Sequence, residues 1–486
     1  MTDPHRNNVT SWSRREFFTA AGFLGLPAYI SLPGLSTAEM AENTVHMETD
    51  VLVVGGGSAG LPAALAAFRQ GVRVVVAEED PQIGGAPVDM FVAMPCGFPR
   101  FGIYRELLDI LETTYNIDGT PVRKEDETKD HWYFPQLYLT AWRKLLGSHK
   151  KLRIVTGARC IGVLTEDAGT RNRVTGAVFD AGRGQRLSIR ASVVIDASGS
   201  GEVSELAGAA CRYGRESREE FEEPFAEESP DTTVMPCTWM MISQRFRPGP
   251  APDFELFKSR AFIDSGVGWY GLNQDDVRGR NTGAYLHWGP TVRCADTRNS
   301  IELGKAASQA LEKLGAEIET WHRNGFNLWL APRLGVRECR RVEGEYIINM
   351  NDLKAGRIPD DTIALGAYYL DAWGHKLTED QRRVDPYGIP YRAVIPRGMG
   401  GLLTAGKCIS GTHLAMSSYR VQCHVAQIGQ AAGIAAAMAV KHQTRVRDID
   451  IAALQQALIA GGIPIDRWRK GDIDVRWRPE PSSCKD

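Results

Sequence analysis

Residues 50–60, Asp-Val-Leu-Val-Val-Gly-Gly-Gly-Ser-Ala-Gly, decide the fold of this chain. The apolar residues 51–54 have the pattern of a buried strand. A G-x-G-x-x-G spacing follows at once, at Gly55, Gly57 and Gly60. Alone this spacing is weak evidence, so its meaning depends on the segments that surround it.

The segments after the glycines complete a βαβ unit. An alanine-rich helix is expected over residues 61–70, and Gly71 ends it. A second strand over residues 72–77 ends at the acidic Glu78, close to the spacing of about 20 residues that the fingerprint requires. The surroundings therefore predict a dinucleotide-binding unit.

Each part of this unit has a physical task. Gly55 makes the tight turn, Gly57 lets the backbone approach a pyrophosphate, and Gly60 lets the helix and strand pack closely. The helix N-terminus presents free N–H groups and a positive dipole end to the phosphates. The Glu78 carboxylate is predicted to accept hydrogen bonds from the ribose hydroxyls.

Three later segments indicate which dinucleotide the unit binds. Gly84 and Gly85 give an E-x-x-x-x-G-G arrangement after Glu78. Residues 193–201 read Val-Val-Ile-Asp-Ala-Ser-Gly-Ser-Gly, and residues 402–407 read Leu-Leu-Thr-Ala-Gly-Lys. The first and third resemble loops that hold FAD in flavoproteins, and the second resembles the flavoprotein strand V-I-D-A-T-G-D-G.

Four separated motifs together resemble one family, the FAD-dependent oxidoreductases with a Rossmann domain of the glutathione-reductase type. Residues 401–421, GLLTAGKCISGTHLAMSSYRV, and 427–433, QIGQAAG, resemble its C-terminal block. Residues 337–346, RECRRVEGEY, resemble its motif RESRRIVGEY, and residues 363–371 are similar to another. The resemblance covers most of residues 48–440.

The resemblance implies FAD as cofactor, with no separate NAD(P)H domain because no second fingerprint follows. The residues expected to contact FAD are Gly55, Gly57, Ser58, Ala59, Gly60, Glu78, Gly84, Gly85, Cys160, Ala197, Gly199 and Gly406. Trp373 and Gly374 stand where the family usually has a histidine, and Ala86-Pro87 also departs from the pattern. Those positions belong to the expected substrate side, so the resemblance identifies no substrate.

The expected fold class is α/β, with a discontinuous Rossmann-type FAD-binding domain and an inserted α+β substrate domain. The FAD domain is predicted over residues 48–212 and 375–440, the substrate domain over 213–374, and a C-terminal tail over 441–486. Smaller features are also predicted: a solvated acidic loop over 215–231, a stiff linker over 247–252, an amphipathic helix over 300–322 and a short helix over 451–460.

The N-terminus resembles a twin-arginine signal peptide. Residues 13–18 read Ser-Arg-Arg-Glu-Phe-Phe, and a mostly apolar, acid-free stretch follows over 19–35. Residues 36–38, Ser-Thr-Ala, offer small residues for cleavage. We expect a signal peptide over residues 1–38, the twin-arginine translocase as a partner, and a periplasmic location. An uncleaved membrane anchor, or a basic arm followed by a short helix, are the alternatives.

Composition agrees with an ordinary globular protein. The 486 residues include 43% hydrophobic and 24% charged residues. The net charge of −2 gives no electrostatic reason to expect nucleic acid as a partner. Nine cysteines at irregular spacing, without a CxxC pair, predict neither a disulfide framework nor a metal cluster.

Three residues are candidates for chemistry near the flavin. His413 follows the Ala-Gly motif and is the candidate acid or base, with Arg420 as a clamp for an anion or carbonyl. Cys96 follows the glycine pair, where a buried inert thiol is the alternative. The alternative for His413 is a residue with satisfied hydrogen bonds behind those that touch the flavin or substrate, and for Arg420 it is a structural ion pair. Arg337, Arg340 and Arg341 are expected to pair with nearby glutamates, and an acidic-substrate site is the alternative for them.

The function expected is oxidation of a small organic substrate by hydride transfer to flavin N5, with electrons passing to a quinone, a carrier or oxygen. A fumarate-reductase-like reduction of an activated double bond is the first alternative. A non-catalytic flavin carrier is the second, although a carrier needs no large substrate domain.

Overall fold

The structure is a computed structural model that describes residues 44–95, 97–114, 133–147, 149, 151–167, 172–247, 269–271 and 284–473. Residues from Val45 onward form one compact unit. The predicted signal peptide and almost all of the predicted linker over 247–252 lie outside the described residues.

The largest sheet has eight strands and contains β1 (Thr44–Val54), which includes the strand predicted before the glycine loop. Its other strands are β2 (Val74–Ala77), β3 (Leu152–Val155), β4 (Arg159–Asp167), β5 (Asn172–Asp180), β6 (Arg186–Asp196), β15 (Met399–Gly400) and β16 (Leu402–Thr404). The main order is β15-β5-β6-β1-β2-β3, with β16 beside β6 and β4 beside β5. Strands β1, β2 and β3 are parallel, as are β6 and β16, so their carboxyl ends meet at one edge.

The predicted βαβ unit is confirmed. Helix α3 (Gly60–Arg69) begins one residue earlier than expected. The first strand is longer than predicted and the second is shorter, because β1 starts at Thr44 and β2 at Val74. Val51 pairs with Val74 and Val54 with Ala77, so the two strands end side by side where the glycine loop leaves β1.

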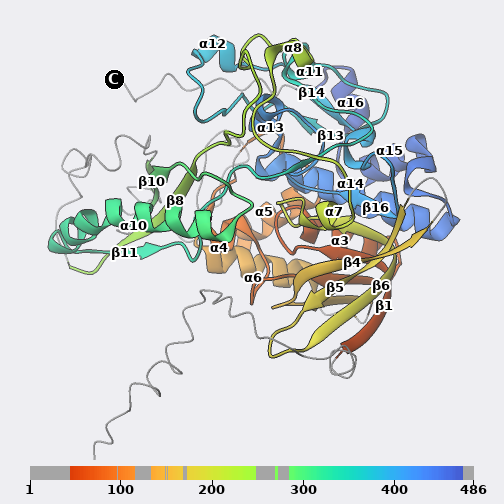
Figure 1. Cartoon of the computed structure of the whole chain (residues 1–486), viewed down its shortest axis with the longest axis horizontal. Coiled ribbons are helices and arrows are strands. Elements are labelled where there is room, and N and C mark those ends of the chain that lie inside the picture. Colours follow the sequence, from red (N-terminus) through yellow and green to blue (C-terminus); the bar gives the residue numbers. More distant parts are fainter. Residues whose placement is uncertain are drawn as a thin grey trace, which may run out of the picture. The chain divides into compact units, whose positions relative to one another are not determined.

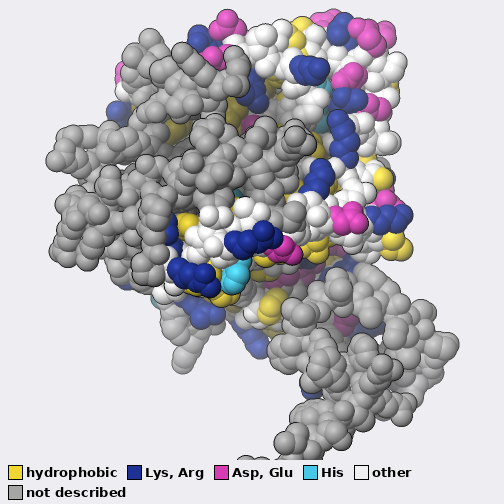
Figure 2. Space-filling model, turned by 90° about the vertical axis from the view of Figure 1, so that its left-hand side faces the viewer, with side chains coloured by type: hydrophobic (Ala, Val, Ile, Leu, Met, Phe, Trp, Pro, Cys, Tyr) yellow, Lys and Arg dark blue, Asp and Glu magenta, His cyan; other side chains and the backbone are white. Residues whose placement is uncertain are grey.

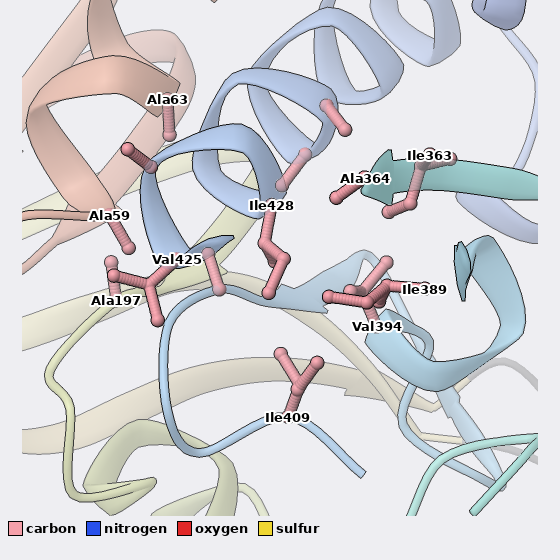
Figure 3. Close-up of a cluster of buried hydrophobic side chains, with 14 of the residues drawn as sticks. Ala59, Ala63, Ala197, Ile363, Ala364, Ile389, Val394, Ile409, Val425 and Ile428 are labelled. Carbon is pink, nitrogen blue, oxygen red and sulfur yellow. The ribbon is translucent and has the colours of Figure 1, made fainter. Parts of the chain in front are cut away.

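Helix α14 (Gln422–His442) packs against α3 and forms the centre of the core. A Cβ added at Gly429 or Gly433 would overlap the carbonyl oxygen of Ala59 or Ala63, so the two helices cross at backbone contact. Figure 3 shows Val425 and Ile428 of α14 between Ala59 on one side and Ile363 on the other. By length and composition α14 could cross a membrane, but 94% of its apolar window is buried in the protein, as in a core helix.

A second, four-stranded sheet has the order β11-β8-β10-β9. Its strands are β8 (Cys237–Arg245), β9 (Trp269–Gly271), β10 (Ala284–Val292) and β11 (Phe326–Leu330). The amphipathic helix predicted over 300–322 is confirmed as α10 (Ser300–Arg323), which packs on this sheet through Ala306, Ala310 and Leu314. In Figure 1 these elements lie together, apart from the main sheet. They fall within the predicted substrate domain, whose exact boundaries stay a prediction.

The remaining elements are two pairs of short strands and the helices that lie between or after the strands along the chain. Paired strands are β7 (Cys211–Arg212) with β12 (Arg341–Val342), and β13 (Thr362–Gly366) with β14 (Tyr387–Pro390). Helices are α4 (Ala86–Asp89), α5 (Gly102–Thr114), α6 (Pro135–Leu146), α7 (Glu202–Leu206), α8 (Arg218–Phe221), α11 (Met350–Lys354), α12 (Glu379–Arg382), η3 (Tyr391–Val394), α13 (His413–Tyr419), η4 (Val446–Asp448), α15 (Ile451–Ala460) and α16 (Ile465–Arg469). Helix α15 confirms the helix predicted over 451–460. On the face drawn in Figure 2, basic and acidic side chains are interspersed.

Candidate functional site

The glycine loop between β1 and α3 is closed tightly at two of its three fingerprint positions. A Cβ added at Gly60 would overlap the carbonyl oxygen of Gly55. A Cβ at Gly55, where φ is +104°, would overlap the carbonyl oxygen of Ala197. These two glycines are therefore needed for the loop itself to form.

Gly57 is different. A Cβ there would meet only the Cα of Gly85, at 3.6 Å, which is ordinary van der Waals contact. The fold alone does not require glycine at this position, so the empty side of Gly57 is a cradle that a Cβ would fill. That is the room a pyrophosphate needs at the N-terminus of α3.

Glu78 and the glycine pair lie against this cradle. The Glu78 carboxylate is buried at the end of β2 and accepts hydrogen bonds from the N–H groups of Gly56 (2.5 Å) and Asp80 (2.9 Å). Burial, opposed by these bonds, raises the pKa of Glu78. The N–H of Gly84 donates to the Gly56 carbonyl (2.9 Å), and Gly85 lies directly beside Gly57.

The ends of β6 and β16 supply the other side of the loop. The Ala197 N–H donates to the Val54 carbonyl (2.9 Å), and Gly406 lies against Ala59. Gly199, with φ +74°, follows Ala197 and approaches the Lys407 side chain. Cys160 is the second residue of β4, and burial raises the pKa of its thiol to about 12.

The predicted cofactor residues therefore gather around one sheet edge, with Cys160 on the strand next to the Glu78 turn. The Ala158 N–H donates to the Glu78 carbonyl (2.8 Å), which fixes that strand's start beside the turn. Their roles toward the cofactor stay predictions. Of the predicted catalytic residues, Cys96 lies outside the described residues.

His413 begins α13 and is buried, with both ring nitrogens engaged. Its Nδ1 lies 2.8 Å from Oε2 of Glu338 and 3.0 Å from Oε1. Its Nε2 lies 3.1 Å from Nε2 of His375. The Glu338 carboxylate can only accept, so Nδ1 of His413 carries a proton. This Glu338–His413–His375 chain is the arrangement that holds one imidazole in a fixed tautomer.

His375 continues the chain toward solvent. Its side chain is 8% exposed, and its Nδ1 lies 4.0 Å from Glu227, whose side chain is 39% exposed. Burial, together with the charges of His413 and Arg215, lowers the pKa of His375 to about 4. His375 is therefore neutral near pH 7, and its separation of 4.0 Å from Glu227 is an electrostatic contact, too long for a hydrogen bond.

The acidic segment over 215–231 is not simply the solvated loop that the sequence predicted. Glu216 and Glu223 are buried at 5% and 1% exposure. Glu216 accepts from the His413 N–H (2.8 Å), and Glu223 accepts from Thr412 Oγ1 (2.6 Å). The prediction is wrong for these two carboxylates because their partners are almost 200 residues away in the sequence and cancel the cost of burial.

Arg341 joins this network as a buried structural cation. Its guanidinium bonds both Glu338 and Glu216, and donates to the carbonyls of Gly214 and Gly411. Arg340 pairs with Glu205 (2.5 Å). The expected pairing with glutamates is therefore confirmed for two of the three arginines.

Arg337 departs from that expectation. In the described part of the chain its bonds go to the Pro236 carbonyl (2.8 Å) and Thr238 Oγ1 (2.6 Å), and its guanidinium stacks over the Trp373 ring at 4.2 Å.

The loop over residues 367–378 runs along α13 in the opposite direction. His375 meets His413 at the start of the helix, and Asp371 meets Arg420 (2.6 Å) at its end. Trp373 lies between these two contacts in sequence and touches Arg337. The departure from the family pattern at Trp373 and Gly374 therefore falls within the segment that covers the candidate site.

The comparisons with known proteins identify the family. Residues 50–458 match the model of the FAD dependent oxidoreductase family. The chain belongs to that family. It is therefore an FAD-dependent enzyme that carries out oxidation and reduction.

Individual relatives of this FAD-dependent oxidoreductase match only short segments. Sarcosine oxidase subunit alpha of Corynebacterium sp. (strain U-96) is 48% identical over 59 residues, 11% of this chain and 6% of that protein. NADH:fumarate oxidoreductase of Klebsiella pneumoniae (strain 342) is 33% identical over 85 residues, 18% of this chain and 9% of that protein. The chain thus spans a small part of the curated relatives it matches. The solved structure of OxyS anhydrotetracycline hydroxylase from Streptomyces rimosus covers 85% of this chain and 66% of its own, at 14% identity and a TM-score of 0.39.

The residues at the sheet edge fit the FAD that the family requires. Gly57 leaves a cradle of the kind a pyrophosphate occupies, and Glu78 lies beside it at the end of β2. Gly406 and Lys407, after β16, would lie nearer the ribityl and flavin end. When bound, FAD supplies the hydride acceptor that no amino-acid side chain provides.

Sequence reasoning did not single out Glu338, Glu216 or Glu223. Glu338 lies inside the motif of residues 337–346, so that motif was the one available signal. The two glutamates of the acidic segment carried no local signal, because their burial depends on contacts with α13 and Arg341.

Proposed function

We propose that this FAD-dependent oxidoreductase is exported and oxidises a small organic substrate by hydride transfer to flavin N5. The observation that carries the proposal is the buried Glu338–His413–His375 chain, built on the helix that follows the Ala-Gly motif. A substrate C–H can leave as hydride only if the O–H or N–H proton has an acceptor.

A substrate that displaces His375 from Nε2 of His413 would leave that nitrogen free to accept the proton. Glu338 fixes the Nδ1 proton of His413 and its negative charge stabilises an imidazolium. Burial alone would raise the pKa of Glu338, but the charges of His413 and Arg341 and its hydrogen bonds lower it, so this carboxylate remains ionised. His375 lies between His413 and the partly exposed Glu227.

Export is proposed on the residues 13–18, the twin-arginine pattern. The twin-arginine translocase carries folded proteins, which suits an enzyme that must bind its flavin before leaving the cytoplasm. The protein would then work in the periplasm or another extracytoplasmic space. A quinone, a soluble carrier or oxygen would accept the electrons there.

The testing experiment is an anaerobic screen of the yellow holoenzyme by flavin absorbance. Bleaching by an alcohol or amine supports the oxidation, whereas re-oxidation of dithionite-reduced enzyme by an enoate alone supports the fumarate-reductase-like alternative. With a reducing substrate known, stopped-flow reduction of His413→Ala should be about 10² to 10⁴-fold slower. His442→Ala, an exposed histidine at the end of α14, is the matched control. A rate for His413→Ala within about threefold of the parent contradicts the role of His413.

A further inference from the structure

Three cations beside the histidine chain have too few negative partners. We call Arg337, Arg420 and Lys407 the cation cluster. In the described part of the chain only Arg420 bonds a carboxylate, that of Asp371 at 2.6 Å. The other two cations bond neutral oxygens. The cluster thus carries more positive than negative charge inside the protein.

Arg420 has bonding capacity left over. Its Nη2 is bound to Asp371, while its Nε is buried and has no hydrogen-bond partner among the described residues. An unsatisfied buried donor on a charged group is costly. Nε of Arg340 also has no partner among the described residues, so what distinguishes Arg420 is the nearby charge of Arg337 and Lys407.

The pKa of Arg337 reflects the shortage of negative partners in the cation cluster. Burial, with the nearby charge of Arg420, lowers the pKa of Arg337 to about 10 although Asp371 opposes the change. Only its Nη1 has bonds to the described residues, to the Pro236 carbonyl and to Thr238 Oγ1.

Lys407 adds the third charge from the loop after β16. Its Nζ donates to the Val336 carbonyl (2.6 Å), next to Arg337 in the chain. Burial is the main cause that lowers the pKa of Lys407, and the charge of Arg420 adds to it. Its Cε lies 3.8 Å from where a Cβ at Gly199 would stand, so the cluster adjoins the predicted flavin-binding edge.

Buried charge is tolerated when it is paired, as Arg341 is with Glu338 and Glu216. The cation cluster lacks such pairing, and it adjoins both the flavin edge and the loop that carries His375. We propose that the cation cluster binds a carboxylate group of the substrate, so that the oxidised molecule is a small organic acid. This inference rests on the proposed function.

The test measures binding without turnover, so it is independent of whether any substrate reduces the flavin. The holoenzyme is titrated with malonate and, separately, with the neutral malonamide, and the flavin difference spectrum and melting temperature are recorded. Malonate should perturb both readouts and malonamide should not. Failure of the proposed function would instead appear as no bleaching by any donor.

Variants locate the effect. Arg337→Met and Arg420→Gln should each weaken malonate binding on the order of 10- to 100-fold, as expected for loss of a hydrogen bond to a charged group. Arg337→Lys keeps the charge and should recover part of the affinity. Arg340→Gln, which removes a cation paired with Glu205, is the control and should bind as the parent does.

Three results would overturn the inference. The first is an equal response to malonate and malonamide. The second is unchanged malonate affinity in both Arg337→Met and Arg420→Gln. The third is loss of FAD from these variants while the holoenzyme fraction that remains binds malonate normally, since the cations would then balance the cofactor's own phosphates.

Discussion

Arg341 and Arg337 are four residues apart in one motif, yet their surroundings are opposite. Arg341 bonds two buried carboxylates and two backbone carbonyls, so the fold neutralises it completely. Arg337 bonds only neutral oxygens of the described chain and lies near a second arginine. The two arginines therefore differ in their hydrogen-bond and ion-pair partners, and these partners separate a structural cation from one that is available for binding.

The glycine loop repeats this contrast. Gly60 has no room for a Cβ, because the Gly55 carbonyl fills the space, whereas Gly57 has room on the side where a pyrophosphate is expected. In both pairs one position is closed by the protein and the other is left open. A substitution at a closed position should therefore cost more stability than one at an open position.

The largest expected effect is that of Gly60→Ala. The added Cβ overlaps the Gly55 carbonyl, so the β1–α3 crossing must open, at a cost of about 4 kcal/mol or more. Urea unfolding followed by circular dichroism measures this loss. The control is Gly304→Ala in α10, an exposed helical site with open space, which should gain about 0.5–1 kcal/mol. A loss under about 1 kcal/mol for Gly60→Ala would contradict the close crossing.

Arg341→Met should come next, with a loss of about 3–5 kcal/mol in the free energy of unfolding. The substitution removes the cation that bonds both Glu338 and Glu216, while the two carboxylates stay buried. Arg323→Gln removes an arginine whose ion pair with Glu319 is exposed at 75% and 72%, and it should change stability by less than about 1 kcal/mol. If both variants unfold alike, the buried network is not what stabilises this region.

His375 should contribute a loss of stability on acidification between about pH 6.5 and pH 4. The pKa of His375 is 6.5 when unfolded and about 4 when folded, so over this range the unfolded chain binds a proton that the folded protein does not. The contribution is therefore complete above pH 6.5 and is lost as the pH falls to about 4. Glu338, whose pKa is also lowered, acts in the same direction.

Urea unfolding at several pH values measures this dependence, and His375→Gln provides the comparison. The variant should show a smaller decrease between pH 6.5 and pH 4 than the parent. His287 and His424, which are buried and also have lowered pKa values, remain in both proteins and cancel in the difference. Parallel curves for the two proteins would count against a neutral, buried His375.

The smallest effect is expected for Arg337→Met. The substitution removes a poorly compensated buried charge, which favours the fold, but leaves Thr238 Oγ1 and the Pro236 carbonyl without their donor. These opposite contributions should leave the free energy of unfolding within about 1 kcal/mol of the parent. A loss as large as that of Arg341→Met would place Arg337 among the structural cations.

The sequence was sufficient where the determining interactions are local. The βαβ unit, α10 and α15 follow from short-range periodicity and glycines. The bounds of the three helices are correct to within one residue, whereas β1 starts well before the predicted strand. The surroundings of His413 were not predictable in this way. Its partners come from residues 216, 338 and 375, and only packing brings them to the start of α13.

We propose that the open side of Gly57 holds the FAD pyrophosphate, and the flavin content of Gly57→Val is the measurement that tests this claim. The open space at Gly57 leaves room for the added Cβ in the fold, so circular dichroism should match that of the parent. The valine side chain would occupy the cradle, so we predict a flavin-to-protein ratio near zero after purification and after incubation with excess FAD. A folded variant that retains one flavin per chain would contradict the claim, because the cofactor would then bind elsewhere.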